Sequence, residues 1–333
     1  MLLGLDVGTT RIKALLVSRE GREVPVPPVP TPFVASSGRI EMSVEALRGA
    51  LIKVLAGLGP ARENVAGIGI AGMAESGAPI GESGRPLAPV IAWHDPRGEG
   101  TVELLRARLG ARLDLSIGQR LRTVSSVAKL GWLIEHGCRG VSRWLGVPEL
   151  CLWLLTEAEA TEHSLVARTG AYDIAARRYL PQVAEVLGVS PAVFAPVGSA
   201  GEVLGRVGRE RARWWGLPEG VPVTIAGHDH LAGAAGAGAR PRDLVNSVGT
   251  AETVIGYSSE LPDLLRAFEA RVAVSIRPGG EGYCLLAGAA RAGILIASAS
   301  AALGATPEAL DRLAESAEGA ERLDGSEILR SLE

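Results

Sequence analysis

The chain opens with a short strand, a Gly-Thr turn and a second strand, and this unit restricts the possible folds more than any other segment. Residues 2–7 are apolar apart from Asp6, residues 8–11 have the composition of a tight turn, and residues 12–17 are apolar again. A second turn at residues 20–22 leads into a Pro-rich stretch. Three antiparallel strands are therefore expected at the N-terminus.

The rest of the chain alternates strand and helix patterns. Ser43 precedes apolar residues at helical spacing and is expected to cap a helix. A second strand pair, around another Gly-Thr turn, is expected at residues 244–247 and 253–257. Further strands are expected at residues 65–71, 90–93 and 221–226, and helices between residues 101 and 187. This order of elements predicts an α/β fold.

Length and composition exclude several classes of protein. The 333 residues suit two domains, and a net charge of −3 argues against nucleic acid or an anionic membrane as a partner. The start, with Asp6 and no basic region, is not expected to be a signal peptide. The longest apolar tract, residues 284–303, is interrupted by Arg291 and is expected to be a packed helix, not a membrane span. Three scattered cysteines without a CxxC pair indicate a reducing compartment, the cytoplasm.

The first segment that could carry chemistry is residues 6–11, with the sequence Asp-Val-Gly-Thr-Thr-Arg. Backbone N–H groups and Thr hydroxyls of such a turn can bind phosphate oxygens, and Asp6 can hold a hydrated Mg²⁺ that bridges them. Arg11 or Lys13 could neutralise charge on a transferring group. The alternative is an ordinary hairpin turn with a solvated Asp6, because Gly-polar turns are common.

Asp229 lies just after the strand at residues 221–226, within the sequence Gly-His-Asp-His. Open α/β folds place reacting groups at such strand ends, so Asp229 could act as a general base toward a substrate hydroxyl. One alternative is a metal site formed with His228 and His230, although no Cys or further His lies nearby in the sequence. The other alternative is a polar strand end without chemistry.

A second candidate phosphate site is the pair Gly249 and Thr250. On its own this pair is a common turn. Together with residues 6–11, it suggests two hairpins that face each other across a cleft and each hold part of a triphosphate.

Two segments that follow short apolar strands, residues 71–77 and 93–97, could contact a hydroxyl-rich ligand. Carboxylates and Arg suit hydroxyl groups, and Trp93 offers an apolar face to a carbon skeleton. The alternative is that Glu75 and Arg97 are surface charges and that Trp93 belongs to the core.

In this order, the segments resemble the FGGY carbohydrate kinases of the actin/hexokinase/Hsp70 ATPase superfamily. Residues 4–13 and 247–250 resemble the family's two phosphate motifs, and residues 69–75 and 93–97 resemble its sugar-contacting segments. Asp229 falls where the family keeps its catalytic Asp. In the central stretch the resemblance rests on Ser126, Lys129, Leu130, Trp132, Leu133, Thr156, Thr161, Glu162, Ser164 and residues 168–173. It covers roughly residues 2–302.

The resemblance implies that ATP phosphorylates a hydroxyl of a small sugar or polyol. Asp229 would be the catalytic base, and Asp6 and Asp229 would hold Mg²⁺ through water. The residues implied in ATP binding are Asp6, Gly8, Thr9, Thr10, Arg11, Lys13, Gly249 and Thr250. The residues implied in sugar binding are Met73, Glu75, Trp93, Asp95, Arg97 and His228.

The implied fold is a pair of ribonuclease-H-like domains with mixed sheets flanked by helices, hinged about a cleft that closes to exclude water. Residues 1–240 would form the N-terminal domain with the sugar site, the first phosphate motif and Asp229. Residues 241–333 would form part of the C-terminal domain with the second phosphate motif. The family's Gly-rich adenosine segment is not found after Leu303, so the second domain is expected to be incomplete.

Three explanations of the short second domain stay open: a fragment, a degenerate relative, or a chain completed by a partner. A homodimer or another partner is expected to cover the exposed sheet edge. The isolated chain is expected to bind its sugar and to have weak or no kinase activity. The rival function is a truncated, non-catalytic sugar-binding or regulatory relative, while the sugar-contacting segments speak against an actin-like assembly protein. Pentuloses, hexuloses, deoxy sugars and polyols all suit the expected pocket.

Overall fold

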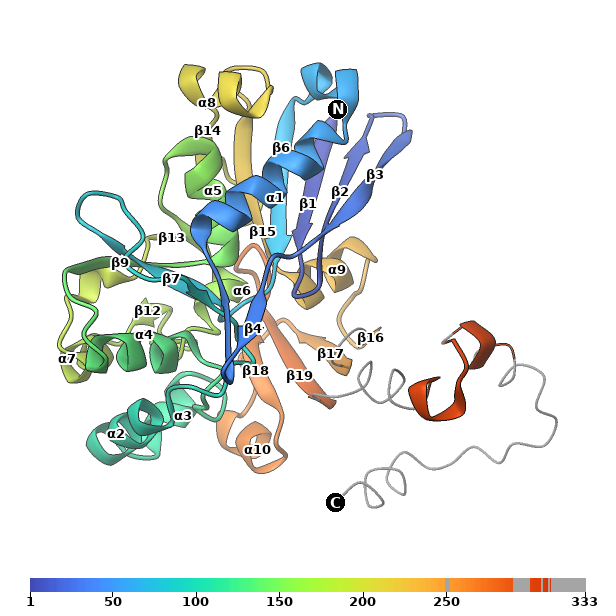
Figure 1. The fold of residues 1–333 in the computed structure, drawn as a ribbon. Coiled ribbons are helices and arrows are strands. Elements are labelled where there is room, and N and C mark those ends of the chain that lie inside the picture. Colours follow the sequence, from blue (N-terminus) through green and yellow to red (C-terminus); the bar gives the residue numbers. More distant parts are fainter. Residues whose placement is uncertain (249–251, 290–299, 307, 311, 313–333) are drawn as a thin grey trace. The chain divides into compact units, whose positions relative to one another are not determined.

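A computed structural model describes residues 1–248, 252–289, 300–306, 308–310 and 312 of the protein. The chain divides into two compact units. The larger comprises Met1–Val245 and Val254–Ala287 and contains most of the elements labelled in Figure 1, and the smaller comprises Asn246–Thr253 and Gly288–Glu333. The domain boundary expected near residue 240 stays a prediction.

A six-stranded sheet forms the centre of the larger unit (Figure 1). Its strands follow the order β14-β15-β6-β1-β2-β3, in which β15, β6 and β1 run parallel and β1, β2 and β3 are antiparallel neighbours. The bounds are β1 (Leu2–Val7), β2 (Arg11–Val17), β3 (Glu23–Pro30), β6 (Gly67–Gly72), β14 (Gly205–Arg206) and β15 (Pro222–His228). The three N-terminal strands predicted from the turn pattern are confirmed.

Helices pack on this sheet through apolar side chains. α1 (Val44–Ala56) begins after Ser43, whose Oγ accepts a hydrogen bond from the Ala46 N–H at 3.0 Å, as the capping pattern predicts. α1 contacts β2 and β3, and α5 (Val147–Thr156) contacts β15 and β6. α8 (Arg209–Trp215) packs on α5, and α9 (Asp229–Gly236) follows β15 directly. The core between these elements consists mostly of aliphatic side chains.

A second sheet has the order β4-β5-β8-β7-β9. Its strands are β4 (Val34–Ser36), β5 (Arg39–Met42), β7 (Gly77–Gly81), β8 (Val90–Ile91) and β9 (Val141–Gly146). Residues 73–76 connect β6 to β7 and so link the two sheets. A second apolar core forms around α2 (Glu99–Leu109), α3 (Arg112–Ser116), α4 (Ser126–Glu135) and α7 (Pro181–Leu187). These helices confirm the helical middle expected from the sequence, although β9 within it was not expected.

Short elements join these layers. They are η1 (Gly59–Asn64), β10 (Thr161–Glu162), α6 (His163–Val166), β11 (Tyr172–Asp173), β12 (Arg178–Tyr179), η2 (Pro191–Val193) and β13 (Val197–Gly198). β10 pairs with β13, and β11 pairs with β12. No helix within the described ranges is long and apolar enough to cross a membrane.

The C-terminal strands include one correction. β16 (Leu244–Val248) and β17 (Glu252–Ser258) match the strands expected around the second Gly-Thr pair. The tract at residues 284–303 was expected to be a helix, but its beginning lies in β19 (Tyr283–Ala289). β19 pairs antiparallel with β18 (Ala273–Ile276), which follows α10 (Leu264–Glu269). A short apolar run suits either a strand or a buried helix, and the pairing with β18 decides it here.

Gly77 and Gly49 give a matched test of the packing. A Cβ on Gly77 would lie 2.7 Å from Leu145 O and from the Trp144 ring, whereas a Cβ on Gly49, within α1, would meet nothing within 4 Å. Gly77→Ala should lower the free energy of unfolding by about 1–3 kcal/mol through overpacking. Gly49→Ala should raise it by roughly 0.5–1 kcal/mol because Ala is the better helix former. Urea unfolding followed by circular dichroism measures both, and a neutral Gly77→Ala would contradict the tight β7–β9 contact.

Candidate active site

The carboxyl ends of three parallel strands bring Asp6 and Asp229 to one edge of the central sheet. In the register of β1, β6 and β15, Asp6 lies opposite Ala71, and Ala71 lies opposite Gly227. Asp229 follows two residues later, at the first position of α9. Neighbouring strands lie about 4.8 Å apart, so the ends of β1 and β15 are separated by only roughly 10 Å. The sheet therefore brings together two carboxylates that are 223 positions apart in the sequence.

Asp6 presents one paired and one unpaired carboxylate oxygen. Its Oδ2 lies 3.3 Å from Lys13 Nζ, while its Oδ1 is buried and has no hydrogen-bond partner among the described residues. Burial raises the pKa of Asp6 and the charge of Asp229 adds to this effect, while Lys13 and His230 act to lower it. An unpaired carboxylate oxygen beside a second acid suits a hydrated Mg²⁺, which supplies positive charge and water donors. The residues present therefore fit this ion.

Two hydrogen bonds hold the turn after β1. The Gly8 N–H donates to Arg11 O at 3.2 Å, and the Thr31 hydroxyl donates to Gly8 O at 2.7 Å. Thr10 and Arg11 are exposed, as is Lys13, whereas Thr9 is half-buried. The Thr9 hydroxyl accepts a hydrogen bond from the indole of Trp93 at 2.9 Å. The turn thus offers N–H groups, hydroxyls and two cations on one short segment.

Asp229 is placed by an irregular strand end. The pairing of β15 with β6 shifts between Ile225 and Gly227, and Gly227 has a φ of +122° that favours glycine. A Cβ at Gly227 would also lie 2.6 Å from Ser164 Oγ. The Asp229 Oδ1 accepts the His230 N–H at 2.8 Å and lies 3.2 Å from His228 Nε2. The carboxylate is therefore oriented before any substrate arrives.

A buried acid, Glu162, is hydrogen-bonded to the residues that hold the end of β15. Its Oε2 accepts the backbone N–H and the hydroxyl of Ser164 at 2.8 and 2.5 Å. Ser164 Oγ in turn accepts the His228 N–H at 2.9 Å, and Glu162 Oε1 accepts the Gly279 N–H at 2.8 Å. Burial raises the pKa of Glu162 to about 7. In the sequence, Glu162 and Ser164 were named only as part of the family resemblance. An acid two residues before a Ser indicates no role by itself, and only the fold brings this pair against Gly227.

The His-Asp-His triplet is compact enough to keep the metal-site alternative open. Ligand atoms of His228, Asp229 and His230 lie within 4.8 Å of one another, and the two imidazole centroids are 5.5 Å apart. His228 is buried, and its pKa is lowered well below the usual range by burial, by Arg168 and by His230. His228 is therefore neutral, and its Nδ1 has no partner in the described part of the chain. Its assignment as a sugar contact stays a prediction.

Glu75 lies in the connection between β6 and β7, at a φ of +71°. Its Oε1 pairs with a guanidinium nitrogen of Arg168 at 2.6 Å, and both side chains are nearly buried, with 8% and 11% of their surface exposed. Ser126 Oγ donates to the Glu75 carbonyl at 3.3 Å. Met73, two residues earlier, is almost fully buried. Arg168 had no assigned role in the sequence, since only the fold brings it to Glu75.

Asp95 and Arg97 form a tight network with each other. Asp95 has no exposed side-chain surface; it accepts hydrogen bonds from the Ile40 N–H at 2.7 Å and from the Arg97 guanidinium at 2.7 and 2.8 Å. Burial acts to raise the pKa of Asp95, but the Arg97 and backbone donors outweigh it and lower the pKa. Arg97 also pairs with Glu41 at 2.5 Å. Both residues thus hold the loop that carries Trp93.

Lys129 anchors the same loop and was not expected to be so deeply buried. Its Nζ donates to the carbonyls of Asp95 and, at 3.1 Å, of Arg97. Burial lowers the pKa of Lys129 to about 8, although the charge of Asp95 acts to raise it. The side chain has no exposed surface. A buried ammonium of this kind is tolerated only because the two carbonyls replace its water.

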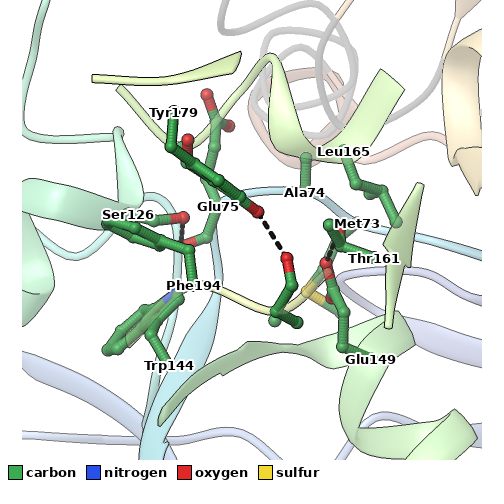
Figure 2. Close-up of a pocket in the computed structure, with 13 residues that line it drawn as sticks. Met73, Ala74, Glu75, Ser126, Trp144, Glu149, Thr161, Leu165, Tyr179 and Phe194 are labelled. Carbon is green, nitrogen blue, oxygen red and sulfur yellow. Dashed lines mark hydrogen bonds between the residues drawn. The ribbon is translucent and has the colours of Figure 1, made fainter. Parts of the chain in front are cut away.

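A cavity lies behind the Glu75 segment (Figure 2). Thr161 Oγ1 donates to Glu149 at one side of it, and the Tyr179 hydroxyl donates to Ala195 O at 2.7 Å. Glu149 Oε2 is buried without a partner among the described residues, and burial raises the pKa of Glu149. The lining residues are Met73, Ala74, Glu75, Ser126, Trp144, Gly146, Glu149, Thr161, Leu165, Thr169, Tyr179, Phe194 and Ala195. The Glu75 segment therefore lines a partly polar cavity.

The expected second phosphate motif includes Gly249 and Thr250. Gly249 and Thr250 lie outside the described residues, so their part in ATP binding stays a prediction. In the smaller unit, the flanking Asn246 Nδ2 donates to Glu252 Oε1 at 2.8 Å.

Comparison with known proteins identifies the relatives of this chain. L-fuculokinase of Escherichia coli K12 is 27% identical over 270 residues, which cover 78% of this chain and 57% of that protein. The crystal structure of xylulose kinase from Rhodospirillum rubrum superposes with a TM-score of 0.80 at 26% identity, covering 88% of this chain and 62% of that one. The structure titled as a xyloylose kinase from Brucella ovis gives a TM-score of 0.83 at 22% identity, covering 93% and 65%.

These likenesses confirm the α/β architecture expected from the sequence. The chain spans about 57% of the length of the fuculokinase that it matches. Residues 1–236 match the N-terminal domain of one family, and this match includes the turn at residues 8–11, the Glu75 segment and Asp229. The chain belongs to the FGGY family of carbohydrate kinases.

Proposed function

We propose that this protein transfers the terminal phosphoryl group of ATP to a hydroxyl of a small sugar or polyol. The observation that carries the proposal is the meeting of Asp229, Asp6 and the Gly-Thr turn at one edge of the sheet. Membership of the FGGY family supports it. The chain spans about 57% of the matched fuculokinase, so the weak or absent activity expected for these 333 residues alone stays a prediction, and the turnover assay below tests it against the proposed transfer.

Asp229 would act as the general base. Its carboxylate is held by the His230 N–H and lies beside the neutral His228, so it can accept the proton of a substrate hydroxyl as that hydroxyl attacks. The Ser164–Glu162 pair holds the His228 peptide and thereby the direction of the side chain that follows. Glu162 is in this sense a positioning residue.

The turn after β1 would bind the phosphates. The Thr9 and Thr10 hydroxyls and the backbone N–H groups of the turn can donate to phosphate oxygens, and Lys13 and Arg11 bring positive charge. Asp6, with its unpaired Oδ1, and Asp229 would hold Mg²⁺ through water. When bound, the ion neutralises charge on the phosphates.

The Glu75 segment and Trp93 would orient the sugar. Glu75 is charge-balanced by Arg168, so it can accept hydrogen bonds from sugar hydroxyls without the cost of an unpaired buried charge. Asp95 and Arg97 would act on the sugar chiefly by holding the Trp93 loop in place.

We also propose that the protein works in the cytoplasm, because Cys138, Cys151 and Cys284 are all free thiols. The expected homodimer, or another covering partner, stays a prediction.

Asp229→Asn tests the base directly. The variant should lower kcat by about 10²–10⁴-fold, the range for loss of a general base, while sugar affinity changes little. A coupled ADP assay over a panel of pentuloses, hexuloses, deoxy sugars and polyols measures turnover, and sugar-induced thermal stabilisation measures binding. Glu103→Gln, an exposed charge change on α2, is the control. Sugar-induced stabilisation of the unmodified protein without any ADP release would instead favour a non-catalytic sugar-binding role.

Glu162→Gln tests the buried support through pH. The pKa of Glu162 is about 7 in the folded protein against an ordinary value of 4.5, so the folded state binds more protons between these values. The contribution of Glu162 to stability therefore falls as pH rises through this window. Gln does not titrate, so the variant should flatten this fall by up to roughly 1.4 kcal/mol per pH unit.

Urea unfolding at several pH values from about 5 to 7 measures the slope. Glu185→Gln, on the exposed face of α7, is the control and should leave the slope unchanged. Parallel slopes for the unmodified protein and Glu162→Gln would show that the acid does not titrate in this range. A fall in kcat for Glu162→Gln, with sugar KM unchanged, is expected from the misplaced Asp229.

A further inference from the structure

Trp93 connects the sugar segment to the phosphate turn. Its indole Nε1–H donates to Thr9 Oγ1 at 2.9 Å, and its backbone N–H donates to Ser76 Oγ at 2.8 Å. Ser76 is fully buried and directly follows Glu75. Two hydrogen bonds thus join the Glu75 segment, Trp93 and the turn at residues 8–11 in series.

The bond to Thr9 fixes what the Thr9 hydroxyl can do. An indole N–H only donates, so Thr9 Oγ1 must accept it with a lone pair. A Thr hydroxyl carries one proton and two acceptor sites, and no hydrogen bond donated by Thr9 is found within the described ranges. The proton of Thr9 is therefore left for a phosphate oxygen, and donors to such charged acceptors form the stronger hydrogen bonds.

The same bond fixes what Trp93 can offer a sugar. Its one polar hydrogen is committed to Thr9, so the half-buried indole presents only its ring to the substrate. A ring face packs against C–H groups and does not distinguish the positions of hydroxyl groups. A bound sugar would therefore pack on the ring whose N–H is bonded to Thr9. Polar groups such as Glu75 would recognise the sugar hydroxyls.

We infer that Trp93 is a positioning residue that couples sugar binding to the phosphate turn by orienting the Thr9 hydroxyl toward ATP. This inference rests on the proposed kinase function. A sugar packed on the indole stabilises the Trp93–Thr9 bond, and the phosphate turn is then better ordered when the acceptor hydroxyl is present. This arrangement favours transfer to the sugar over transfer to water.

Three variants separate this role from simple sugar contact. Trp93→Phe keeps an aromatic face but removes the indole N–H together with part of the ring. Thr9→Val removes the hydroxyl at nearly constant shape, and Thr9→Ser keeps it. Trp93→Phe and Thr9→Val should each lower kcat/KM for ATP about tenfold, the size expected for one hydrogen bond to a charged group. Sugar KM should stay within about twofold, since the ring face remains. The double variant should be no worse than Thr9→Val alone, because without the hydroxyl the indole N–H has nothing left to orient.

Thr9→Ser keeps the hydroxyl and should therefore lose less kcat/KM for ATP than Thr9→Val. Trp214→Phe, which changes an exposed indole on α8, is the control and should behave like the unmodified protein. A Trp93→Phe variant that raises sugar KM and leaves the ATP kinetics intact would overturn the inference while the kinase function stands. Additive losses in the double variant would overturn it as well.

Hydrogen exchange separates failure of the inference from failure of the kinase function. The sugar of the panel that most raises the thermal stability of the unmodified protein is added without ATP. Exchange at residues 8–11 should slow in the unmodified protein and not in Trp93→Phe. Equal slowing in both, or in neither, contradicts the coupling. Absence of turnover with every sugar contradicts the kinase function, whatever the exchange result.

Discussion

Parallel pairing of β1, β6 and β15 is the constraint on which the rest of this structure depends. Parallel strands end at the same edge, so whatever follows each strand is gathered there. The Gly-Thr turn follows β1, the Glu75 segment follows β6, and Asp229 follows β15. Three segments spread over more than two hundred residues thereby become neighbours. A shift in strand register would separate all of them at once.

Buried polar networks then set the direction of the side chains at this edge. Ser164, held by Glu162, accepts a hydrogen bond from the His228 N–H. Arg168 forms an ion pair with Glu75. Lys129 donates hydrogen bonds to the loop that contains Asp95 and Arg97. Each network has a buried charge whose donors or acceptors replace water, and losing one partner leaves the other unpaired at high cost. Such supports make the edge rigid, which suits a site that must align a hydroxyl with a phosphate.

Much of this arrangement follows from local patterns in the sequence. The N-terminal strands, the helix capped by Ser43 and the strands around residues 249–250 depend on turn chemistry and periodicity, which act over a few residues. The helix expected for residues 284–303 was wrong at its start, because the mostly apolar run at residues 283–289 acquires strand geometry by pairing with β18. The roles of Glu162 and Arg168 were equally invisible, since Gly279 lies 117 positions from Glu162 and Glu75 lies 93 positions from Arg168.

The sequence by itself determined the α/β class, the turn at residues 8–11 and the acid at position 229, because glycine, hydroxyl residues and alternating apolar positions carry these signals locally. Only the tertiary structure decided which acidic side chains lie close to one another and which are paired with a basic residue. Asp6 and Asp229 share a sheet edge, Asp95 is enclosed by Arg97, and the Trp93 indole reaches Thr9. These outcomes depend on strand register and on side-chain hydrogen bonds across the core, and both arise only when distant segments pack together.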